Sequence, residues 1–117
     1  MTDQRFRRGQ HIRHRTDFQH VYDRGRKVHG RTMTIFLLHQ PGAATRLGIA
    51  ATKKIGGAVE RNRAKRLVRE LFRRNPAPPG YDVVVVPRRA VFDVSFSSLE
   101  SEYVATVGRL GAPARSR

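Results

Sequence analysis

Residues 53–74, KKIGGAVERNRAKRLVRELFRR, have the clearest structural pattern in the chain. Gly56 and Gly57 interrupt regular structure, and a helical period follows from about Ala58 to Arg74. At about 100° per residue, the apolar side chains fall on one side of this helix: Ala64, Leu67, Val68, Leu71 and Phe72. Cations and one amide fall on the other: Asn62, Lys65, Arg66, Arg69 and Arg73. The stretch predicts a helix with one face against a core and a cationic face outward.

The cations are concentrated in two blocks. The chain has 24 Lys and Arg against 9 Asp and Glu, a net charge of +15. Residues 1–31 hold nine Lys and Arg against three acids, residues 53–74 hold nine against two, and residues 32–52 hold only Arg46. This excess favours a polyanionic partner, because binding nucleic acid releases counterions and relieves self-repulsion. The mixture of Arg and Asn suits a surface that bonds phosphates, sugars and base edges.

Size and composition exclude several classes of protein. The 117 residues fit one domain, which we expect to span residues 1–117, with a core at about 13–110 and mobile tails at 1–12 and 111–117. The absence of cysteine excludes disulfides, thiolate nucleophiles and Cys-ligated zinc. No apolar run approaches the roughly 20 residues that span a bilayer, and no signal peptide opens the chain. We therefore expect a cytoplasmic protein without a membrane partner.

The histidines and acids form no catalytic or metal-binding motif. His11 and His14 lie in the basic first segment, and the other histidines share no spacing that a general base or a metal site requires. Asp17 is interpreted as a helix cap, and Glu60 and Glu70 as local charge partners. The double glycine offers backbone N–H groups to a phosphate in one interpretation and a flexible link in the other; the preceding Lys residues favour the first.

The first half of the chain predicts a helix followed by two strands. Thr16-Asp17 offers an N-cap, Phe18, Val21 and Tyr22 share a face at i, i+3, i+4 spacing, and the helix is expected to end near Gly25. Met33–His39 and residues 46–52 are rich in strand formers, and the Gln-Pro-Gly turn between them predicts an antiparallel pair.

After the basic helix, residues 75–80 form a Pro-rich connector and residues 82–86 a strand whose valines indicate burial on both faces. Residues 97–100, SSLE, match a capping box for a last helix that buries a stripe: Leu99, Tyr103, Val107 and Leu110. The order helix, strand, strand, helix, strand, helix predicts an α+β fold, an α/β sandwich with helices packed on a small sheet.

Residues 48–70 closely resemble the signature region of the bacterial ribonuclease P protein subunit. The shared positions there are Leu47-Gly48-Ile49, Lys53-Lys54-Ile55-Gly56, Ala58-Val59, Arg61-Asn62-Arg63, Lys65-Arg66 and Arg69. The resemblance extends to Asp17-Phe18-Gln19 with Val21, Tyr22 and Gly25, to Phe36, and to Gly80-Tyr81-Asp82-Val83-Val84 with Arg88. It covers roughly residues 13–110.

The resemblance implies a sheet of four strands with three helices and a left-handed crossover around the basic helix, whereas general rules favour a right-handed one. It also implies a protein that joins a large catalytic RNA and promotes removal of the 5′ leader from precursor tRNA. Mg²⁺ held by the RNA and the substrate then supplies the activated water. The activity is that of an endoribonuclease whose catalytic centre is in the RNA, so no catalytic residue, no metal ligand and no obligate protein partner is expected in this chain.

Two sets of site residues follow from the resemblance and the charge pattern. The set expected to bind the RNA subunit is Lys53, Lys54, Arg61, Asn62, Arg63, Lys65, Arg66 and Arg69. Arg61 lies at the flank of the apolar side, where its stem can pack over the core edge. The set expected to bind the leader, in a cleft between the first helix and the sheet, is Phe18, Tyr22, Phe36 and Thr52. Thr52 ends an Ala-Ala-Thr run where relatives more often carry Ser and Val.

The aromatic residues and the chain as a whole also have other interpretations. The aromatic side chains either stack on exposed bases or fill the core of an amphipathic helix. The chain as a whole could be a ribosomal or RNA-assembly protein that binds structured RNA without recognising a leader. A self-sufficient nuclease is the third class, and it requires a protein-borne catalytic site that the sequence does not display.

Overall fold

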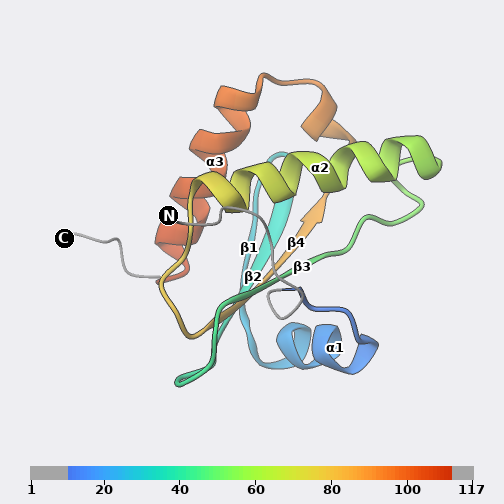
Figure 1. Ribbon diagram of the computed structural model, residues 1–117. Helices are drawn as coiled ribbons and strands as arrows, with labels where there is room; N and C mark the ends of the chain where they lie inside the picture. Colours follow the sequence, from blue (N-terminus) through green and yellow to red (C-terminus); the bar gives the residue numbers. More distant parts are fainter. Residues whose placement is uncertain (1–10, 112–117) are drawn as a thin grey trace, which may run out of the picture.

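The structure is a computed structural model that describes residues 11–111. Its elements in chain order are α1 Arg15–Arg24, β1 Arg26–His29, β2 Met33–His39, β3 Arg46–Ile49, α2 Ala58–Arg74, β4 Tyr81–Pro87, the 3₁₀ helix η2 Arg89–Phe92, and α3 Phe96–Arg109. The four strands form one sheet in the order β1-β2-β4-β3 (Figure 1). Three α-helices on a mixed sheet confirm the α+β prediction.

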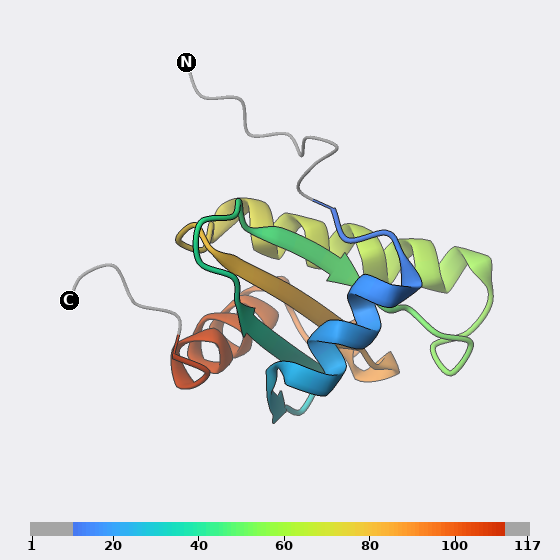
Figure 2. The same cartoon turned by 90° about the horizontal axis from the view of Figure 1, so that it is seen from below.

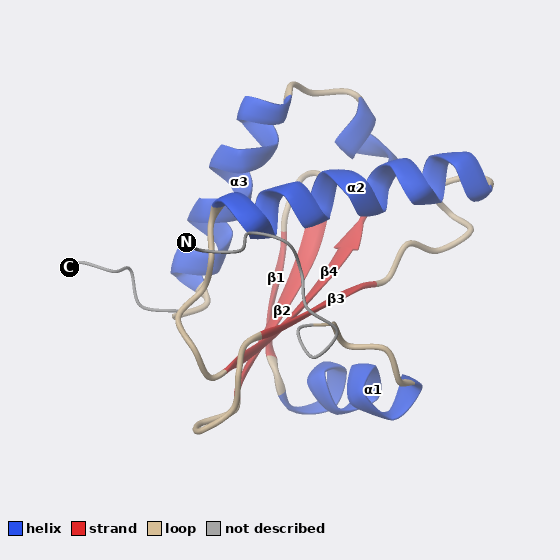
Figure 3. Ribbon diagram, in the orientation of Figure 1, coloured by secondary structure: helices blue, strands red, loops and turns tan. Residues whose placement is uncertain are grey.

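The helices lie on opposite faces of the sheet. α1 covers one face, and α2 and α3 lie on the other (Figures 2 and 3). Side chains alternate between these faces along each strand. In β2, Ile35 and Leu37 belong to the core beneath α2 and α3, whereas Phe36 and Leu38 pack on the side of α1.

The two faces have cores of different size. Beneath α2 and α3 lies a large aliphatic core: Met33, Ile35, Leu37, Leu47, Ile55, Ala64, Val68, Leu71, Phe72, Val83, Val85, Val91, Leu99, Tyr103 and Leu110. The cluster on the α1 side has three buried members, Ile12, Val21 and Val84. Its other apolar members are only partly buried: Phe18, Tyr22, Phe36, Leu38 and Val86. Ile12 also donates its N–H to Leu47 O at 2.9 Å, so packed structure begins within the first described residues; residues 1–10 and 112–117 lie outside them.

The predicted antiparallel pairing of the second and third strands is wrong. β4 lies between β2 and β3, antiparallel to β2 and parallel to β3. Its valines are buried on both faces, and such a strand belongs in the middle of a sheet. β3 also ends at Ile49 rather than at residue 52. The residue pattern did not predict β1, because Val28 is its only apolar residue, but the four strands that the resemblance implies are confirmed.

Two predicted helix starts are also wrong. α1 begins at Arg15 after His14, so Asp17 lies inside the first turn and accepts from Arg46 Nη1 at 3.5 Å instead of capping the helix. α3 begins at Phe96, because Ser95 Oγ accepts the N–H of Ser98 at 3.1 Å. Ser95 thus caps α3 with its side chain, whereas His14, at the N-cap position of α1, makes no side-chain capping hydrogen bond.

The connection from β3 through α2 to β4 joins parallel neighbours. Figure 2 views the sheet from the side of α1: β3 and β4 both run to the right, β4 lies below β3, and α2 lies behind them. The chain runs to the right along β3, returns behind the sheet through α2, and enters β4 below β3, so this crossover is left-handed. Most parallel crossovers are right-handed, and the left-handed form is the one that the resemblance implies. No helix between residues 11 and 111 is long and apolar enough to cross a membrane.

Candidate nucleic-acid interface

α2 is anchored by one face and charged on the other. Ala64, Val68, Leu71 and Phe72 are buried in the large core, and Leu67 is partly buried beside them. These are the five apolar residues that helical periodicity assigned to one side. The anchored face fixes the direction in which the opposite side chains point.

The cationic surface consists of side chains from α2 and the loop before it. Its exposed members are Lys53, Lys54, Asn62, Arg63, Arg66 and Arg69, and its half-buried members are Arg61 and Lys65. Within residues 11–111, none of its cations forms an ion pair with Asp or Glu. The surface therefore carries uncompensated positive charge on a fixed support.

The last turn of α2 differs from the cationic surface. Arg73 donates two hydrogen bonds to Glu70, at 3.1 and 2.5 Å. Arg74 lies 3.3 Å from Glu100 of α3, and its guanidinium stands over the Phe96 ring at 5.2 Å. Positive charge at this end of the helix is balanced by neighbouring acids, so the cations of α2 and its entry loop that have no ion pair lie within residues 53–69.

Two guanidinium groups hold the loop before α2. Arg61 donates to Gly56 O at 3.0 Å, and Arg89 of η2 donates to Ile55 O at 2.5 Å. The Ile55 side chain is buried in the large core. Arg61 therefore packs at the flank of α2, as expected, and it helps to hold the backbone that carries Lys53 and Lys54.

The double glycine does not offer its amides to a ligand. Gly56 N–H donates to Lys53 O at 3.1 Å, and Gly57 N–H donates to Glu60 Oε1 at 3.0 Å. The expected phosphate contact through these amides is wrong, because the loop uses both groups itself. Gly56 is needed for its shape: its φ of +142° lies in a region that side chains with a Cβ rarely adopt.

Arg63 and Arg69 have different surroundings on the cationic surface. The Arg63 guanidinium lies 4.7 Å from the centroid of the Phe92 ring, a cation–π contact that orients it. Arg69 lies near the chain segment that enters α1. Burial, followed by the charges of Arg13 and Arg69, lowers the pKa of His11. The positive charge of Arg69 on α2 thus acts on His11, which lies just before α1.

The aromatic residues on the α1 side form a ring cluster, defined as Phe18, Tyr22 and Phe36. Centroids are 6.3 Å apart for Phe18 and Tyr22 and 4.8 Å apart for Tyr22 and Phe36, the latter edge to face. All three side chains are half-buried. The structure thus places them both against the small core and at the surface, so packing and base stacking are compatible here.

A buried carboxylate holds the other end of this face. Asp82, which is 2% exposed, accepts two hydrogen bonds from Arg46, at 3.0 and 2.8 Å. Arg46 also reaches Asp17 of α1. The hydrogen bond to Asp82 is the main cause that raises the pKa of Arg46. This network ties α1 to the sheet and so sets the position of the ring cluster.

Thr52 lies in the turn after β3. Its side chain is exposed, and its hydroxyl accepts the N–H of Lys54 at 3.3 Å. No contact described between residues 11 and 111 joins Thr52 to the ring cluster. It belongs to the same loop as the lysines of the cationic surface.

Periodicity did not single out four polar residues on the α1 side of the sheet: Lys27, His29, Thr34 and Arg88. Lys27 Nζ lies 5.8 Å from the centroid of Phe36. Thr34 alternates with Phe36 along β2 and could have been placed on this side from the sequence. Lys27 and His29 could not, because β1 carries no recognisable strand pattern.

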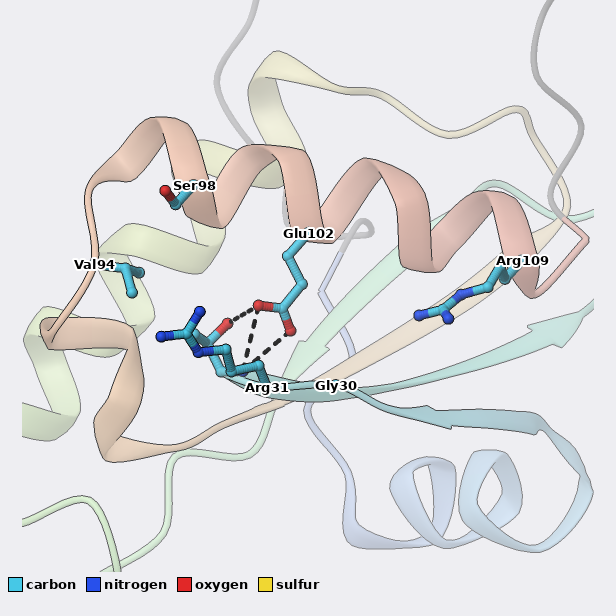
Figure 4. Close-up of a pocket in the computed structure, with 7 residues that line it drawn as sticks. Gly30, Arg31, Val94, Ser98, Glu102 and Arg109 are labelled. Carbon is cyan, nitrogen blue, oxygen red and sulfur yellow. Dashed lines mark hydrogen bonds between the residues drawn. The ribbon is translucent and has the colours of Figure 1, made fainter.

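A separate cavity of about 310 Å³ lies between α3 and the turn from β1 to β2. Glu102 reaches from α3 to that turn, with Arg31 and Arg109 on either side (Figure 4). Its carboxylate accepts the Thr32 hydroxyl at 2.7 Å and the Thr32 N–H at 3.1 Å. Glu102 is thus engaged in fixing the β1–β2 turn.

The part of the chain between residues 11 and 111 contains no group of three His, Asp or Glu side chains that could hold a metal ion.

Comparisons with known proteins agree on one family. A family model described as Ribonuclease P matches residues 6–111. The "Ribonuclease P protein component" of Symbiobacterium thermophilum is 40% identical over 103 residues, which cover 86% of this chain and 90% of that protein. The protein of the same description from Clostridium botulinum (strain Loch Maree / Type A3) is 33% identical, with 86% and 93% covered.

Solved structures give the same result. The ribonuclease P protein of Thermotoga maritima superposes with a TM-score of 0.75 at 31% identity, covering 85% of this chain and 96% of that one. The Staphylococcus aureus protein superposes with a TM-score of 0.77 at 27% identity, covering 88% and 96%. Sequence and fold are thus shared over nearly the whole length of these proteins.

Proposed function

Because the chain belongs to the ribonuclease P protein family and is thus a protein component of that ribonuclease, we propose that its cationic surface binds the RNA subunit. The observation that carries this proposal is the uncompensated charge of residues 53–69 on a core-anchored helix. Phosphates that meet such a surface release counterions, which favours binding. The proposed contact residues are Lys53, Lys54, Arg61, Asn62, Arg63, Lys65, Arg66 and Arg69.

The ring cluster is proposed to bind the single-stranded 5′ leader of precursor tRNA. Its half-buried rings offer π faces to unpaired bases, and each stacked base contributes about 1–3 kcal/mol in single-strand binders. Lys27 beside Phe36 supplies a cation for the leader backbone. Thr52 contributes a hydroxyl from the turn after β3. Apart from Thr52, which shares its loop with Lys53 and Lys54, the residues assigned to the leader and to the RNA subunit lie on different elements of the protein.

The chemical step is proposed to take place in the RNA. Mg²⁺ bound by the RNA and the substrate supplies the activated water for phosphodiester hydrolysis. The protein's part is to bind and orient two RNA molecules. The proposal places it in the cytoplasm, together with precursor tRNA.

Cleavage of precursor tRNA at low Mg²⁺ tests this function. Three reactions are compared: protein alone, cognate RNA subunit alone, and the two together. We expect cleavage at the mature 5′ end only when the RNA is present, with a clear increase on adding protein. Cleavage by protein alone would contradict an RNA catalyst. No increase in the combined reaction would instead favour an RNA-binding protein with another role.

A further inference from the structure

Three polar side chains on the α1 side of the sheet form a hydrogen-bonded chain. His29 of β1 and Thr34 of β2 are cross-strand neighbours, and Thr34 Oγ1 lies 2.9 Å from His29 Nδ1. Arg88, just after β4, donates from Nη1 to the same oxygen at 2.8 Å. Side chains from two adjacent strands, and from a residue 54 positions after Thr34, thus converge on one hydroxyl group.

The donor in each hydrogen bond follows from the chemistry of the groups. Arginine only donates, so Thr34 Oγ1 accepts from Arg88. The Thr34 side chain is 8% exposed, and its hydroxyl proton requires an acceptor. Within residues 11–111, the remaining partner of this hydroxyl is His29 Nδ1. A neutral His29 therefore accepts at Nδ1 and carries its proton on Nε2.

Protonation of His29 does not change the outward-facing group. The imidazolium carries protons on both nitrogens, so Nε2 remains a donor in either charge state. The histidine side chain is exposed, whereas the hydroxyl that orients it is nearly buried. The network thus presents a directed N–H group at the surface of the edge strand β1.

This donor lies beside the ring cluster. Thr34 and Phe36 point to the same face of β2, and their cross-strand partners on β1 are His29 and Lys27. The charged groups facing this patch are Lys27 and Arg88; no acid between residues 11 and 111 bonds to either of them or to His29. A patch with donors and no carboxylate selects a ligand rich in acceptor atoms.

We infer that His29 is a further leader-binding residue, which donates its Nε2–H to an acceptor atom of a leader nucleotide next to the one on the ring cluster. Thr34 and Arg88 are positioning residues for it. The acceptor is either a phosphate oxygen or the oxygen or nitrogen of a base edge. The inference rests on the proposed function, since it adds a subsite to the proposed leader surface.

Equilibrium binding of precursor and mature tRNA by the reconstituted RNA–protein complex tests this assignment. We expect His29→Ala to weaken binding of the precursor about three- to tenfold, the worth of one hydrogen bond, and to leave mature tRNA unchanged. His39→Ala is the matched control, because His39 is an exposed histidine on the other face of β2. Binding of the precursor by His29→Ala at the wild-type level would overturn the inference.

The positioning role has its own pair of variants. Thr34→Val keeps the volume but removes the hydroxyl, so we expect a loss similar to that of His29→Ala. Thr34→Ser restores the hydroxyl and is expected to restore binding. Thermal unfolding of each variant identifies any loss that comes from the fold. Equal losses in the Val and Ser variants, with unchanged unfolding, would contradict the positioning role.

Modified leaders identify the acceptor atom. A leader with one methylphosphonate, or with one abasic nucleotide, is bound by wild type and by His29→Ala. At the contacted position the difference between the two proteins should vanish, for the methylphosphonate if a phosphate accepts and for the abasic site if a base accepts. A difference that survives every substitution contradicts the subsite. Wild-type protein that does not prefer the precursor contradicts the proposed function itself.

Discussion

The two faces of the sheet are built for different purposes. Beneath α2 and α3 the core is continuous and aliphatic, and its members are almost fully buried. On the side of α1, three apolar side chains among residues 11–111 are buried, and the three rings of the ring cluster remain half-buried. One face buries its apolar surface under two helices, and the other is covered by α1 and leaves part of its apolar surface exposed.

The comparison explains where the charge lies. α2 carries its cations on the outside of the well-packed face, where the core beneath fixes the helix along its length. α1 carries no comparable anchor and is tied by the Arg46–Asp82 network. A rigid support suits a large structured RNA, and a partly covered apolar face suits a flexible single strand.

The largest effect should come from a substitution in the core beneath α2 and α3. Leu71 is fully buried under α2, and Leu71→Ala should lower the free energy of unfolding by about 2–5 kcal/mol, because it leaves a cavity in a packed core. Urea unfolding followed by circular dichroism measures this. A decrease below about 1 kcal/mol would show that the face is less tightly packed than the buried residues indicate.

The next effect concerns binding of the RNA subunit. Replacing Arg66 and Arg69 together by Ala should weaken affinity by about 2–4 kcal/mol at low salt, because two charged side chains no longer meet the RNA. It should also reduce the slope of log K against log salt by about 1 for each phosphate that is no longer neutralised. Titrations at several salt concentrations measure both quantities.

Arg73 and Arg74 provide a matched control on the same helix, because Glu70 and Glu100 already balance them. The Arg73→Ala, Arg74→Ala double variant should change the salt slope much less. A similar change in both double variants would mean that the RNA does not distinguish the two ends of α2.

Substitutions on the α1 side of the sheet should change the binding of the substrate. Phe18→Ala should weaken binding of precursor tRNA by about 1–3 kcal/mol, the range for removing one stacking ring. Binding of mature tRNA should be unchanged, since it lacks a leader. Equal weakening for the two RNAs would assign Phe18 to packing alone.

Thr52→Ala should give the smallest change, a decrease of about 0.5 kcal/mol in precursor binding. The Thr52 hydroxyl already accepts the Lys54 N–H, so a leader atom competes with the loop for it. The same titration with precursor and mature tRNA measures it. An effect as large as that of Phe18→Ala would move the leader closer to the turn after β3.

Much of the fold was predictable where one local pattern decides the structure. Residue periodicity predicted the bounds of α2 and β2 correctly, because each has a strong apolar stripe. Strand pairing was not predictable in this way, since alternation does not reveal which strand lies alongside. The caps were wrong where polar side chains serve distant partners, as Asp17 does with Arg46.

The site was predictable to the same extent. Helical spacing placed the cations of α2 on one face and grouped Phe18 with Tyr22, and the resemblance added Phe36, Lys53 and Lys54. The binding roles of these residues stay predictions. The His29–Thr34–Arg88 network was not predictable, because it joins three segments and depends on strand register. Neither could the sequence indicate that Arg61 and Arg89 bond backbone carbonyls.

That pair of arginines has a consequence for how the protein meets its partner. Arg61 and Arg89 hold the carbonyls of two consecutive residues, Gly56 and Ile55, while the Ile55 side chain sits in the core. Lys53 and Lys54 are therefore carried on a backbone that is fixed before any RNA arrives. Binding then orders only the lysine side chains, and the loop loses little conformational entropy. A preorganised loop of this kind contributes more to affinity than a flexible loop, because binding does not have to order its backbone.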